Sequence, residues 1–267
     1  MEQQVQWYPG HMVQTTRRIR EYLRLIDVVI EVVDARIPRS GRSPMLDRLI
    51  AHRARVVALS RDDLADPQTT QRWRDDLARH GSTAVAVDAR SQRSVARLVP
   101  AIVRLPGSGR GAARIARAMI VGLPNSGKSS IVNGLARRAA AKTEDRAGVT
   151  RQLRWFRLGP NVEVMDTPGI LTPKISPAAQ WKLAICGAVP RNRYDPVEVA
   201  GAFHRWLLAR APAAGVPDLQ TFAASRGFMR RGAELDYHNA AQSYIRAFND
   251  GVFGRISLEA PDDAEAA

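Results

Sequence analysis

The sequence predicts an α/β fold, a doubly wound and mostly parallel sheet that is followed by a small all-α region. Short β-branched runs alternate with helical patterns over the first part of the chain, which is typical of a doubly wound sheet. One of these runs leads into a Gly-rich turn that opens a helix. After Pro173 and Pro177 only helical patterns follow. We therefore expect two domains, residues 1–172 and 173–267.

The expected elements follow from apolar periodicity and from the positions of Gly and Pro. Strands are predicted at residues 27–33, 55–59, 83–87, 118–121, 154–158 and 162–165. Helices are predicted at residues 14–25, 44–51, 70–80, 94–105, 129–141, 178–189, 196–211, 219–226 and 234–250. The run at 27–33 is almost entirely apolar, which indicates a strand that is buried on both faces. The acidic end, residues 259–267, is expected to fray.

Composition points to a polyanionic partner. The chain has 267 residues, enough for a large core and a second small one. Lys and Arg number 40 against 26 Asp and Glu, which gives a net charge of +14. Nucleic acid is the commonest partner for such a charge, with a generally Arg-rich composition as the alternative. The single cysteine, Cys186, excludes a disulfide within the chain, and no apolar run suits a membrane span.

The stretch A-M-I-V-G-L-P-N-S-G-K-S-S, residues 118–130, carries the sharpest motif. Gly122 and Gly127 allow the backbone to curl so that its N–H groups face phosphate oxygens at a helix N-terminus. Lys128 would then reach the β- and γ-phosphates, and Ser129 would bind Mg²⁺. The other residues assigned to this nucleotide-binding loop are Pro124, Asn125, Ser126 and Ser130. The alternative is a Gly-rich turn that binds nothing.

Two later motifs complete a nucleotide site. Asp166 begins D-T-P-G at the end of a predicted strand and is a second candidate ligand for Mg²⁺. Gly169 can offer its backbone N–H to a γ-phosphate, so the segment after it would sense that phosphate. Thr150, in G-V-T, could complete the Mg²⁺ coordination in the triphosphate state. The three motifs in this order are more specific than any one of them.

The candidate for base recognition is Ser60-Arg61-Asp62-Asp63, which stands where Asn-Lys-x-Asp would specify guanine. Asp63 keeps the carboxylate that accepts hydrogen bonds from the N1–H and the exocyclic amine of guanine. Arg61 can lie over the plane of the base. Ser60 lacks the amide with which Asn would brace the loop. The alternative is a plain charged turn.

Taken together, the motifs resemble the ribosome biogenesis GTPase A family of circularly permuted GTPases. The matching residues are W-Y-P-G-H-M (7–12), D-A-R-I-P (34–38), G-L-P-N-S-G-K-S (122–129), G-V-T (148–150) and D-T-P-G-I (166–170). They occur in the order of the family, with base recognition ahead of the phosphate loop. The resemblance implies a permuted P-loop GTPase-type sheet, with Mg²⁺ and GTP or GDP as cofactors.

The same resemblance implies a role in maturation of the large (50S) ribosomal subunit through binding of ribosomal RNA. GTP hydrolysis would be slow alone and stimulated by the ribosome. We expect a cytoplasmic protein with no membrane or DNA partner, monomeric off the ribosome. Because the segment after Gly169 runs directly into the helical domain, nucleotide state could tilt that domain. Arg226, Phe228, Arg230 and Arg231 are the expected RNA contacts, with a solvated basic face as the alternative.

Family analogy assigns three further roles. Ile170 stands where a water-orienting glutamine would be, so His11 becomes the candidate catalytic residue, with a purely structural His as the alternative. Asn125 is a candidate for holding K⁺, or is structural. Asp88 and Ala89 stand at the second base-contacting loop and match it loosely. Lys128, Thr150 and Gly169 complete the expected catalytic set.

Two other functions compete with the GTPase. The departure at Ser60 and Arg61 leaves open an RNA- or ribosome-binding scaffold with a weakened or non-hydrolysing nucleotide site. Intact Lys128 and Asp166 argue against that reading. A phosphotransferase built on the same loop is weaker, because D-T-P-G is a sensing segment and no acceptor-binding lid is evident.

Overall fold

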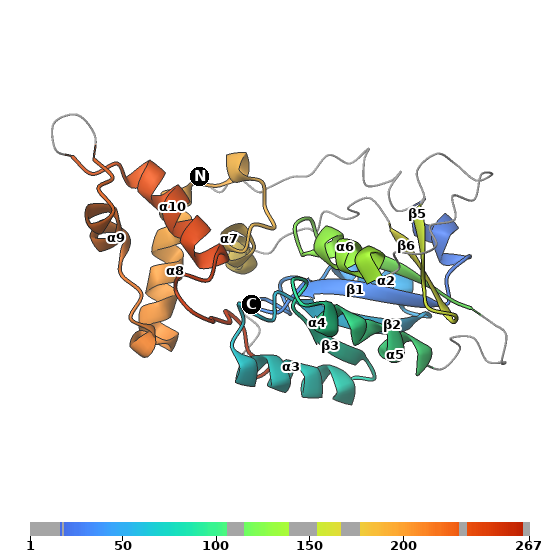
Figure 1. Cartoon of the computed structure of the whole chain (residues 1–267). Helices are drawn as coiled ribbons and strands as arrows, with labels where there is room; N and C mark the ends of the chain where they lie inside the picture. The colour runs from blue at the N-terminus through green and yellow to red at the C-terminus, as the bar shows by residue number, and fades with distance from the viewer. Residues whose placement is uncertain are drawn as a thin grey trace.

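The computed structural model describes residues 17, 19–105, 115–138, 154–166, 177–229 and 234–263, and the statements below concern these residues. They form an α/β lobe and a helical lobe, which lies against one end of the sheet (Figure 1). None of the described helices is both long and apolar enough to cross a membrane.

The α/β lobe is organised on a sheet of 6 described strands in the order β3-β2-β1-β4-β6-β5. The strands are β1 (Val28–Asp34), β2 (Ala54–Ser60), β3 (Thr83–Val87), β4 (Ala116–Gly122), β5 (Arg154–Leu158) and β6 (Val162–Asp166). Only the β5–β6 pair at one edge is antiparallel. The doubly wound sheet predicted from the sequence is therefore confirmed, with every predicted strand present.

The strand order creates a crevice between β1 and β4. From β1 the chain moves outward to β3, and from β4 it moves in the opposite direction to β6. In register, Val32 of β1 pairs with Gly122, and Asp34 at the end of β1 pairs with Ser60. The loops that follow β1, β2 and β4 consequently leave the same edge of the sheet, where open α/β sheets bind their ligands.

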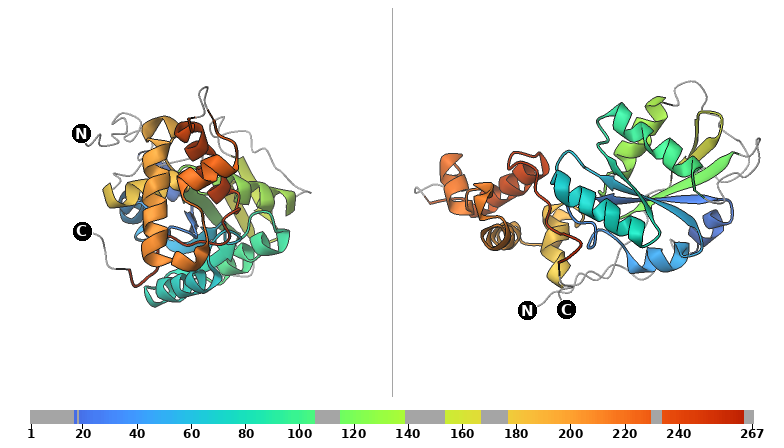
Figure 2. Two further views of the ribbon diagram at one scale, coloured as in Figure 1. Left: turned by 90° about the vertical axis from the view of Figure 1, so that its left-hand side faces the viewer. Right: turned by 90° about the horizontal axis from the view of Figure 1, so that it is seen from below.

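Helices cover both faces of this sheet (Figure 2). They are α2 (Pro44–Ile50), α3 (Pro67–Arg79), α4 (Gln92–Ala96), α5 (Leu98–Val103) and α6 (Lys128–Arg138). All seven residues of β1 are buried, as its apolar run predicts. Val28, Ile30 and Val32 pack on the side of α4, α5 and α6, whereas Val29 packs on the side of α2 and the helical residues at 19–23.

Proline and glycine account for two differences from the predicted helices. The helix predicted at 94–105 is divided into α4 and α5, because Pro100 has no N–H and its ring would clash with the carbonyl of Ala96. The helix predicted at 178–189 already ends at Ile185. Gly187 adopts a φ of +79°, and its N–H donates to the carbonyl of Ala184 (3.0 Å) in a left-handed helix end.

The helical lobe has a core of its own. It contains α7 (Pro177–Ile185), α8 (Pro196–Arg210), α9 (Leu219–Ser225) and α10 (Tyr237–Asn249). Aromatic rings join these helices, and the ring centroids of Phe203 and Phe248 are 4.9 Å apart. Ile37 and Leu123, from loops of the α/β lobe, belong to the same buried cluster, so the two lobes share apolar contact. The domain boundary expected at 172/173 lies outside the described residues.

The segment 252–263, here called the C-terminal strap, returns to the α/β lobe. Glu259 is buried, and its carboxylate accepts hydrogen bonds from the backbone N–H groups of Arg39 (2.8 Å) and Ser40 (3.0 Å). The N–H of Ile256 donates to the carbonyl of Leu64 (3.0 Å). The prediction that the acidic end frays is thus wrong for residues 259–263, because a buried carboxylate anchors them.

Candidate nucleotide-binding site

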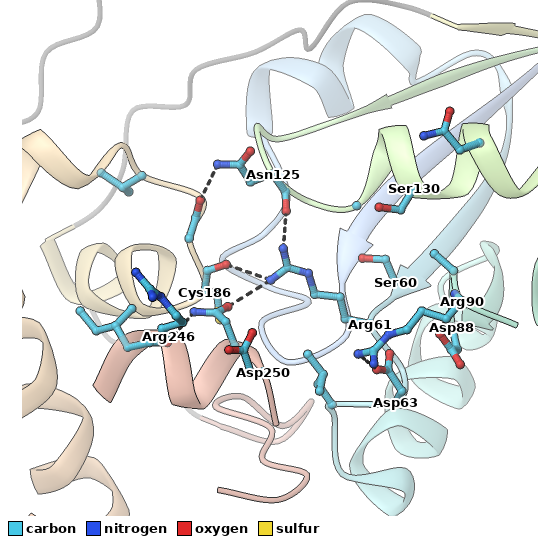
Figure 3. Close-up of a pocket in the computed structure, with 18 of the residues that line it drawn as sticks. Ser60, Arg61, Asp63, Asp88, Arg90, Asn125, Ser130, Cys186, Arg246 and Asp250 are labelled. Carbon is cyan, nitrogen blue, oxygen red and sulfur yellow. Dashed lines mark hydrogen bonds and ion pairs between the residues drawn. The ribbon is translucent and has the colours of Figure 1, made fainter. Parts of the chain in front are cut away.

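A cleft of about 790 Å³ opens at the carboxyl edge of the sheet, between the two lobes (Figure 3). The loop after β2, the loop after β3 and the phosphate loop after β4 form its inner walls. Residues that line it from the α/β lobe include Ser60, Arg61, Asp63, Asp88, Ala89, Asn125, Gly127 and Ser130. The helical lobe supplies the outer wall with Cys186, Gly187, Tyr194, Arg246 and Asn249, among others.

Glycine is required twice in the phosphate loop, residues 122–129. Gly122 has a φ of +151°, and a Cβ there would lie 2.3 Å from the carbonyl oxygen of Val32. Gly127 has a φ of +93°, and a Cβ would lie 3.3 Å from the side chain of Ser60. The backbone therefore turns tightly against β1 and the loop after β2, as a phosphate-cradling loop must.

Lys128 and the two serines that follow it open α6. Lys128 is buried, and its ammonium group donates a hydrogen bond to the carbonyl of Leu123 within the loop. Ser129 and Ser130 are exposed in the first turn of the helix. This arrangement places a cation and a hydroxyl at a helix N-terminus, which suits phosphate and a phosphate-bound cation.

A divalent cation here would need nucleotide phosphates as ligands. Among the described residues, no group of three His, Cys, Asp or Glu side chains could hold a metal ion. Mg²⁺ is commonly held by one or two protein oxygens together with phosphates and water, which fits the exposed Ser129 hydroxyl. Strand β6 pairs in parallel with β4, so the backbone of Asp166 ends at the same sheet edge as Gly122.

Several predicted residues cannot be placed. Thr150, Gly169 and His11 lie outside the described residues, and of Asp166 only the backbone is described.

Ser60 braces the phosphate loop, contrary to the expectation drawn from its missing amide. Its hydroxyl lies 2.5 Å from the carbonyl oxygen of Ser126 and 3.2 Å from that of Val33. The hydroxyl therefore lies within hydrogen-bond distance of the phosphate loop and of strand β1, and at 1% exposure it is shielded from water. A serine can do this because the Gly127 backbone approaches it so closely.

Arg61 is directed toward the phosphate loop and the helical lobe (Figure 3). The residue has a φ of +55°, and its guanidinium donates to the carbonyls of Asn125 (3.0 Å) and Cys186 (3.1 Å). It also forms an ion pair with Asp34 at 3.4 Å. The guanidinium is therefore engaged by two carbonyls and a carboxylate, and its position over a base stays a prediction.

Asp63 is at the cleft and is paired with Arg90. The Arg90 guanidinium donates to the Asp63 carboxylate at 2.6 Å, while the Arg90 backbone N–H donates to Asp88 at 2.8 Å. Asp88 is itself held through its N–H by the hydroxyl of Ser94 (3.0 Å). The loop containing Ala89 is thereby fixed next to the base-recognition loop.

Sequence reasoning did not foresee the buried pair behind Arg61. Arg36 is fully buried and donates to the two oxygens of Asp34 at 3.0 and 2.8 Å. Burial by itself raises the pKa of Asp34, but the charge and hydrogen bonds of Arg36 outweigh it and lower that pKa. Arg36 also donates to Asn249 at 3.1 Å. The D-A-R-I-P motif was the sequence signal for the Asp34–Arg36 pair, but nothing in it indicated that Asn249 would be a partner of Arg36.

The expected RNA contacts fall on the outer part of the helical lobe. Arg226 is exposed, with its guanidinium carbon 5.0 Å from the ring centroid of Phe222. Phe228 is half-buried and stacks on the same ring, with centroids 6.5 Å apart. Arg230 and Arg231 lie outside the described residues. The structure therefore brings Arg226 and Phe228 together around one aromatic side chain.

Known GTPases resemble this chain in sequence. A family model described as "50S ribosome-binding GTPase" matches residues 117–188. The ribosome biogenesis GTPase A of Priestia megaterium is 36% identical, covering 98% of this chain and 98% of the relative. That of Thermotoga maritima is 31% identical, covering 96% and 95%. The bovine mitochondrial ribosome-associated GTPase 1 is 29% identical, covering 95% and 88%.

Solved structures agree with the sequence comparison. A GDP-bound structure of YlqF is similar with a TM-score of 0.73 and 28% identity, covering 92% of this chain and 100% of that chain. The GNP-bound structure of YlqF from T. maritima gives a TM-score of 0.73 and 27% identity, with 94% and 100% covered. By fold, by motif order and by identity over nearly its whole length, the chain belongs to the ribosome biogenesis GTPase A family.

Proposed function

We propose that this chain is a Mg²⁺-dependent GTPase that acts as a nucleotide-controlled assembly factor for the large (50S) ribosomal subunit. The observation that carries the proposal is the cleft in which the phosphate loop, the Asp63 loop and the helical lobe meet. A nucleotide in that cleft would contact both lobes. Its phosphate state can therefore alter how the lobes are held together.

In this proposal each loop has one task. Lys128 neutralises the β- and γ-phosphates, and Ser129 with Asp166 holds Mg²⁺. Thr150 and Gly169 respond to the γ-phosphate. Asp63 accepts hydrogen bonds from guanine after Arg90 has moved away, while the backbone near Ala89 contacts the opposite edge of the base. GTP and GDP would both fit, as in the GDP- and GNP-bound relatives.

Hydrolysis is proposed to be slow in the isolated protein and faster on the ribosome. Isolated GTPases without an added catalytic group turn over at roughly 10⁻⁴ s⁻¹. His11 would orient the attacking water, and Asn125 would hold K⁺ through its side-chain oxygen. The Asn125 amide nitrogen already donates to the carbonyl of Gly187 (2.8 Å), which supports a side chain fixed beside the phosphates.

The proposed partner is ribosomal RNA of the large subunit. The net charge of +14 supplies long-range attraction to RNA. Arg226 and Phe228, with Arg230 and Arg231, would grip phosphate and stack on an unpaired base. We propose that the protein works in the cytoplasm and is monomeric away from the ribosome.

One observation favours a second candidate, a ribosome-binding scaffold with a weakened nucleotide site. The Asp63 carboxylate is paired with Arg90, and the Arg61 guanidinium is bonded to Cys186 and Asn125. Both side chains must then change partners, or contribute less, when guanine binds.

Hydrolysis of GTP with and without purified large subunits tests the proposal. We expect slow turnover alone, a clear increase with large subunits, and a loss of about a hundredfold in Lys128→Ala. Arg48→Ala, which removes an exposed cation on α2, is the control for a lost positive charge. Ribosome binding without GTP hydrolysis would favour the scaffold, and rapid turnover by the isolated protein would contradict the proposed regulation.

A further inference from the structure

Three side chains converge on the carboxyl end of α7, the carbonyls of residues 185–187. The last carbonyls of a helix have no partner within it and accept from elsewhere. Here Asn249 donates to Ile185 (2.6 Å), Arg61 to Cys186 (3.1 Å) and Asn125 to Gly187 (2.8 Å). One helix end of the helical lobe is thus capped by residues from α10, the base-recognition loop and the phosphate loop.

Asn249, the last residue of α10, uses both ends of its amide. Its oxygen accepts from Arg36 (3.1 Å) and Arg61 (3.2 Å). Its nitrogen donates to the carbonyls of Ile185 (2.6 Å) and Ile245 (2.9 Å). An amide offers two donors and two acceptor positions, so the group is fully used. The orientation of this side chain is therefore fixed from both lobes.

The residue held in this way is Arg61, which precedes Asp63 by two positions. Arg61 has a left-handed backbone conformation, with a φ of +55°, that a residue with a side chain adopts only when its surroundings impose it. Its guanidinium is bonded to Asn249, Cys186 and Asn125. Asp34 is a fourth partner of this guanidinium, so loss of the Asn249 contact would loosen the turn that carries Asp63 without releasing it completely.

We propose that Asn249 is a positioning residue for guanine-nucleotide binding, acting through Arg61. The helical lobe thereby supplies part of the nucleotide site rather than only a surface for RNA. This inference rests on the proposed function, since it assumes that the cleft binds guanine nucleotide. Linkage then requires the converse effect, that bound nucleotide stabilises the α10 contact with Arg61 by the same coupling free energy.

Binding of fluorescently labelled GDP to the full chain tests the inference. Asn249→Leu removes all four hydrogen bonds at nearly the same volume, and we expect about a tenfold loss of affinity. Tyr244→Phe is the matched control on the same helix. It removes the bond from the Tyr244 hydroxyl to the carbonyl of Pro217 (2.8 Å), and neither residue is among the hydrogen-bond partners given above for Arg61 and Asn249. Its affinity should stay within about twofold of the wild type.

Asn249→Asp separates positioning from simple structural support. The carboxylate can still accept hydrogen bonds from the two arginines, as the amide oxygen does, but it loses the donors to Ile185 and Ile245. If Asn249 acts through Arg61, this variant retains affinity within about threefold of the wild type. An equal loss in Asn249→Asp and Asn249→Leu would overturn the inference, because the donors would then carry the effect.

A double-mutant cycle tests whether Asn249 acts through Arg61. In an Arg61→Ala background, Asn249→Leu should cause no further loss of GDP affinity. The same loss in both backgrounds would show that Asn249 works by another route and would overturn the inference. Failure of the wild-type chain to bind GDP would instead contradict the proposed function, so the two failures are distinguishable. Thermal unfolding of each variant verifies that the compared proteins are folded.

Discussion

The two loops that define the cleft are supported in different ways. Besides its contacts with Ser60 and Arg61, the phosphate loop has bonds within itself, including the N–H of Ser126 to the carbonyl of Leu123 (3.3 Å) and the ammonium of Lys128 to the same carbonyl. The base-recognition loop, residues 60–63, relies on distant parts of the chain. Arg61 contacts Cys186 and Asn249, and Arg255 donates to the carbonyl of Asp62 (2.6 Å).

This difference explains why one loop keeps its motif and the other can depart from it. A loop that has bonds within itself needs particular residues at particular spacings, such as Gly122, Gly127 and Lys128. A loop that is braced from outside can exchange the residue types inside it, provided that the external contacts remain. Ser60 and Arg61 keep contact with the phosphate loop through Ser126 and Asn125.

The largest effect should come from breaking the buried Asp34–Arg36 ion pair, which lies behind the base-recognition loop. Asp34→Asn leaves the guanidinium of Arg36 buried without its counter-ion. We expect the free energy of unfolding to fall by about 3–5 kcal/mol, measured by chemical denaturation. Arg17→Ala, in an exposed pair with Glu21, should change it by less than about 0.5 kcal/mol. A loss below about 1 kcal/mol in Asp34→Asn would show that the pair is not a support.

The difference in unfolding free energy between wild type and Asp34→Asn should depend on pH, which gives a second test of the Asp34–Arg36 pair. Arg36 lowers the folded-state pKa of Asp34 below its ordinary value of 3.8, so the folded protein prefers the ionised form. This stabilisation is present above that value and is lost as the pH falls through the folded-state pKa. The difference in unfolding free energy between wild type and Asp34→Asn should therefore shrink below about pH 4.

The other shifted buried carboxylate nearby does not obscure this titration. Glu31 has a pKa that burial raises, which acts in the opposite direction, but it is present in both proteins and cancels in the difference. A difference that grows on acidification would contradict the assignment of the effect to the Asp34–Arg36 pair.

Breaking the local support should weaken nucleotide binding strongly, with less effect on folding. Gly122→Ala places a Cβ 2.3 Å from the carbonyl oxygen of Val32, so the phosphate loop must shift. We expect GDP affinity to fall by about a hundredfold, since the phosphate cradle depends on that backbone. Gly159→Ala is the control, because it also has a positive φ (+69°) but nothing lies within 4 Å of the added Cβ. Similar losses in both variants would refute the geometric reason.

The contact between the two loops should give the smallest effect. Ser60→Ala removes the hydroxyl that lies 2.5 Å from the carbonyl of Ser126. We expect GDP affinity to fall about three- to tenfold, the range for one neutral hydrogen bond. Fluorescence titration measures the affinity. The control is Ser257→Ala, which removes a hydroxyl of the C-terminal strap that accepts from the N–H of Asp66 (3.0 Å). An unchanged affinity would mean that Ser60 does not brace the loop.

Local patterns explain how much of the fold the sequence could predict. Each strand is a short apolar run between turn residues, and Asp-Pro at 66–67 and at 195–196 begins α3 and α8 with capping bonds from Asp66 and Asp195. The end of α7 at Ile185 depends on Gly187, whereas the apolar pattern predicts a helix that continues to residue 189. The C-terminal strap could not be foreseen, because its anchor Glu259 binds Arg39, which is 220 residues away.

In the site too, features set by neighbouring residues could be predicted and features set by distant residues could not. The phosphate loop could be predicted because its motif consists of consecutive residues, 122–129. The surroundings of Arg61 could not, because its partner Asn249 is 188 residues away and an asparagine at a helix end carries no signal of its own. The bracing by Ser60 was missed for a related reason, since it depends on how closely Gly127 approaches.

The central claim is that Ser60-Arg61-Asp62-Asp63 reads guanine although it lacks the Asn and Lys of the usual motif. Competition between nucleotides for the wild-type chain tests this most directly, with labelled GDP displaced by unlabelled GDP or ADP in the presence of Mg²⁺. We predict that ADP competes at least about a hundredfold more weakly than GDP, because only guanine offers two donors to Asp63. Equal competition by ADP would contradict the claim.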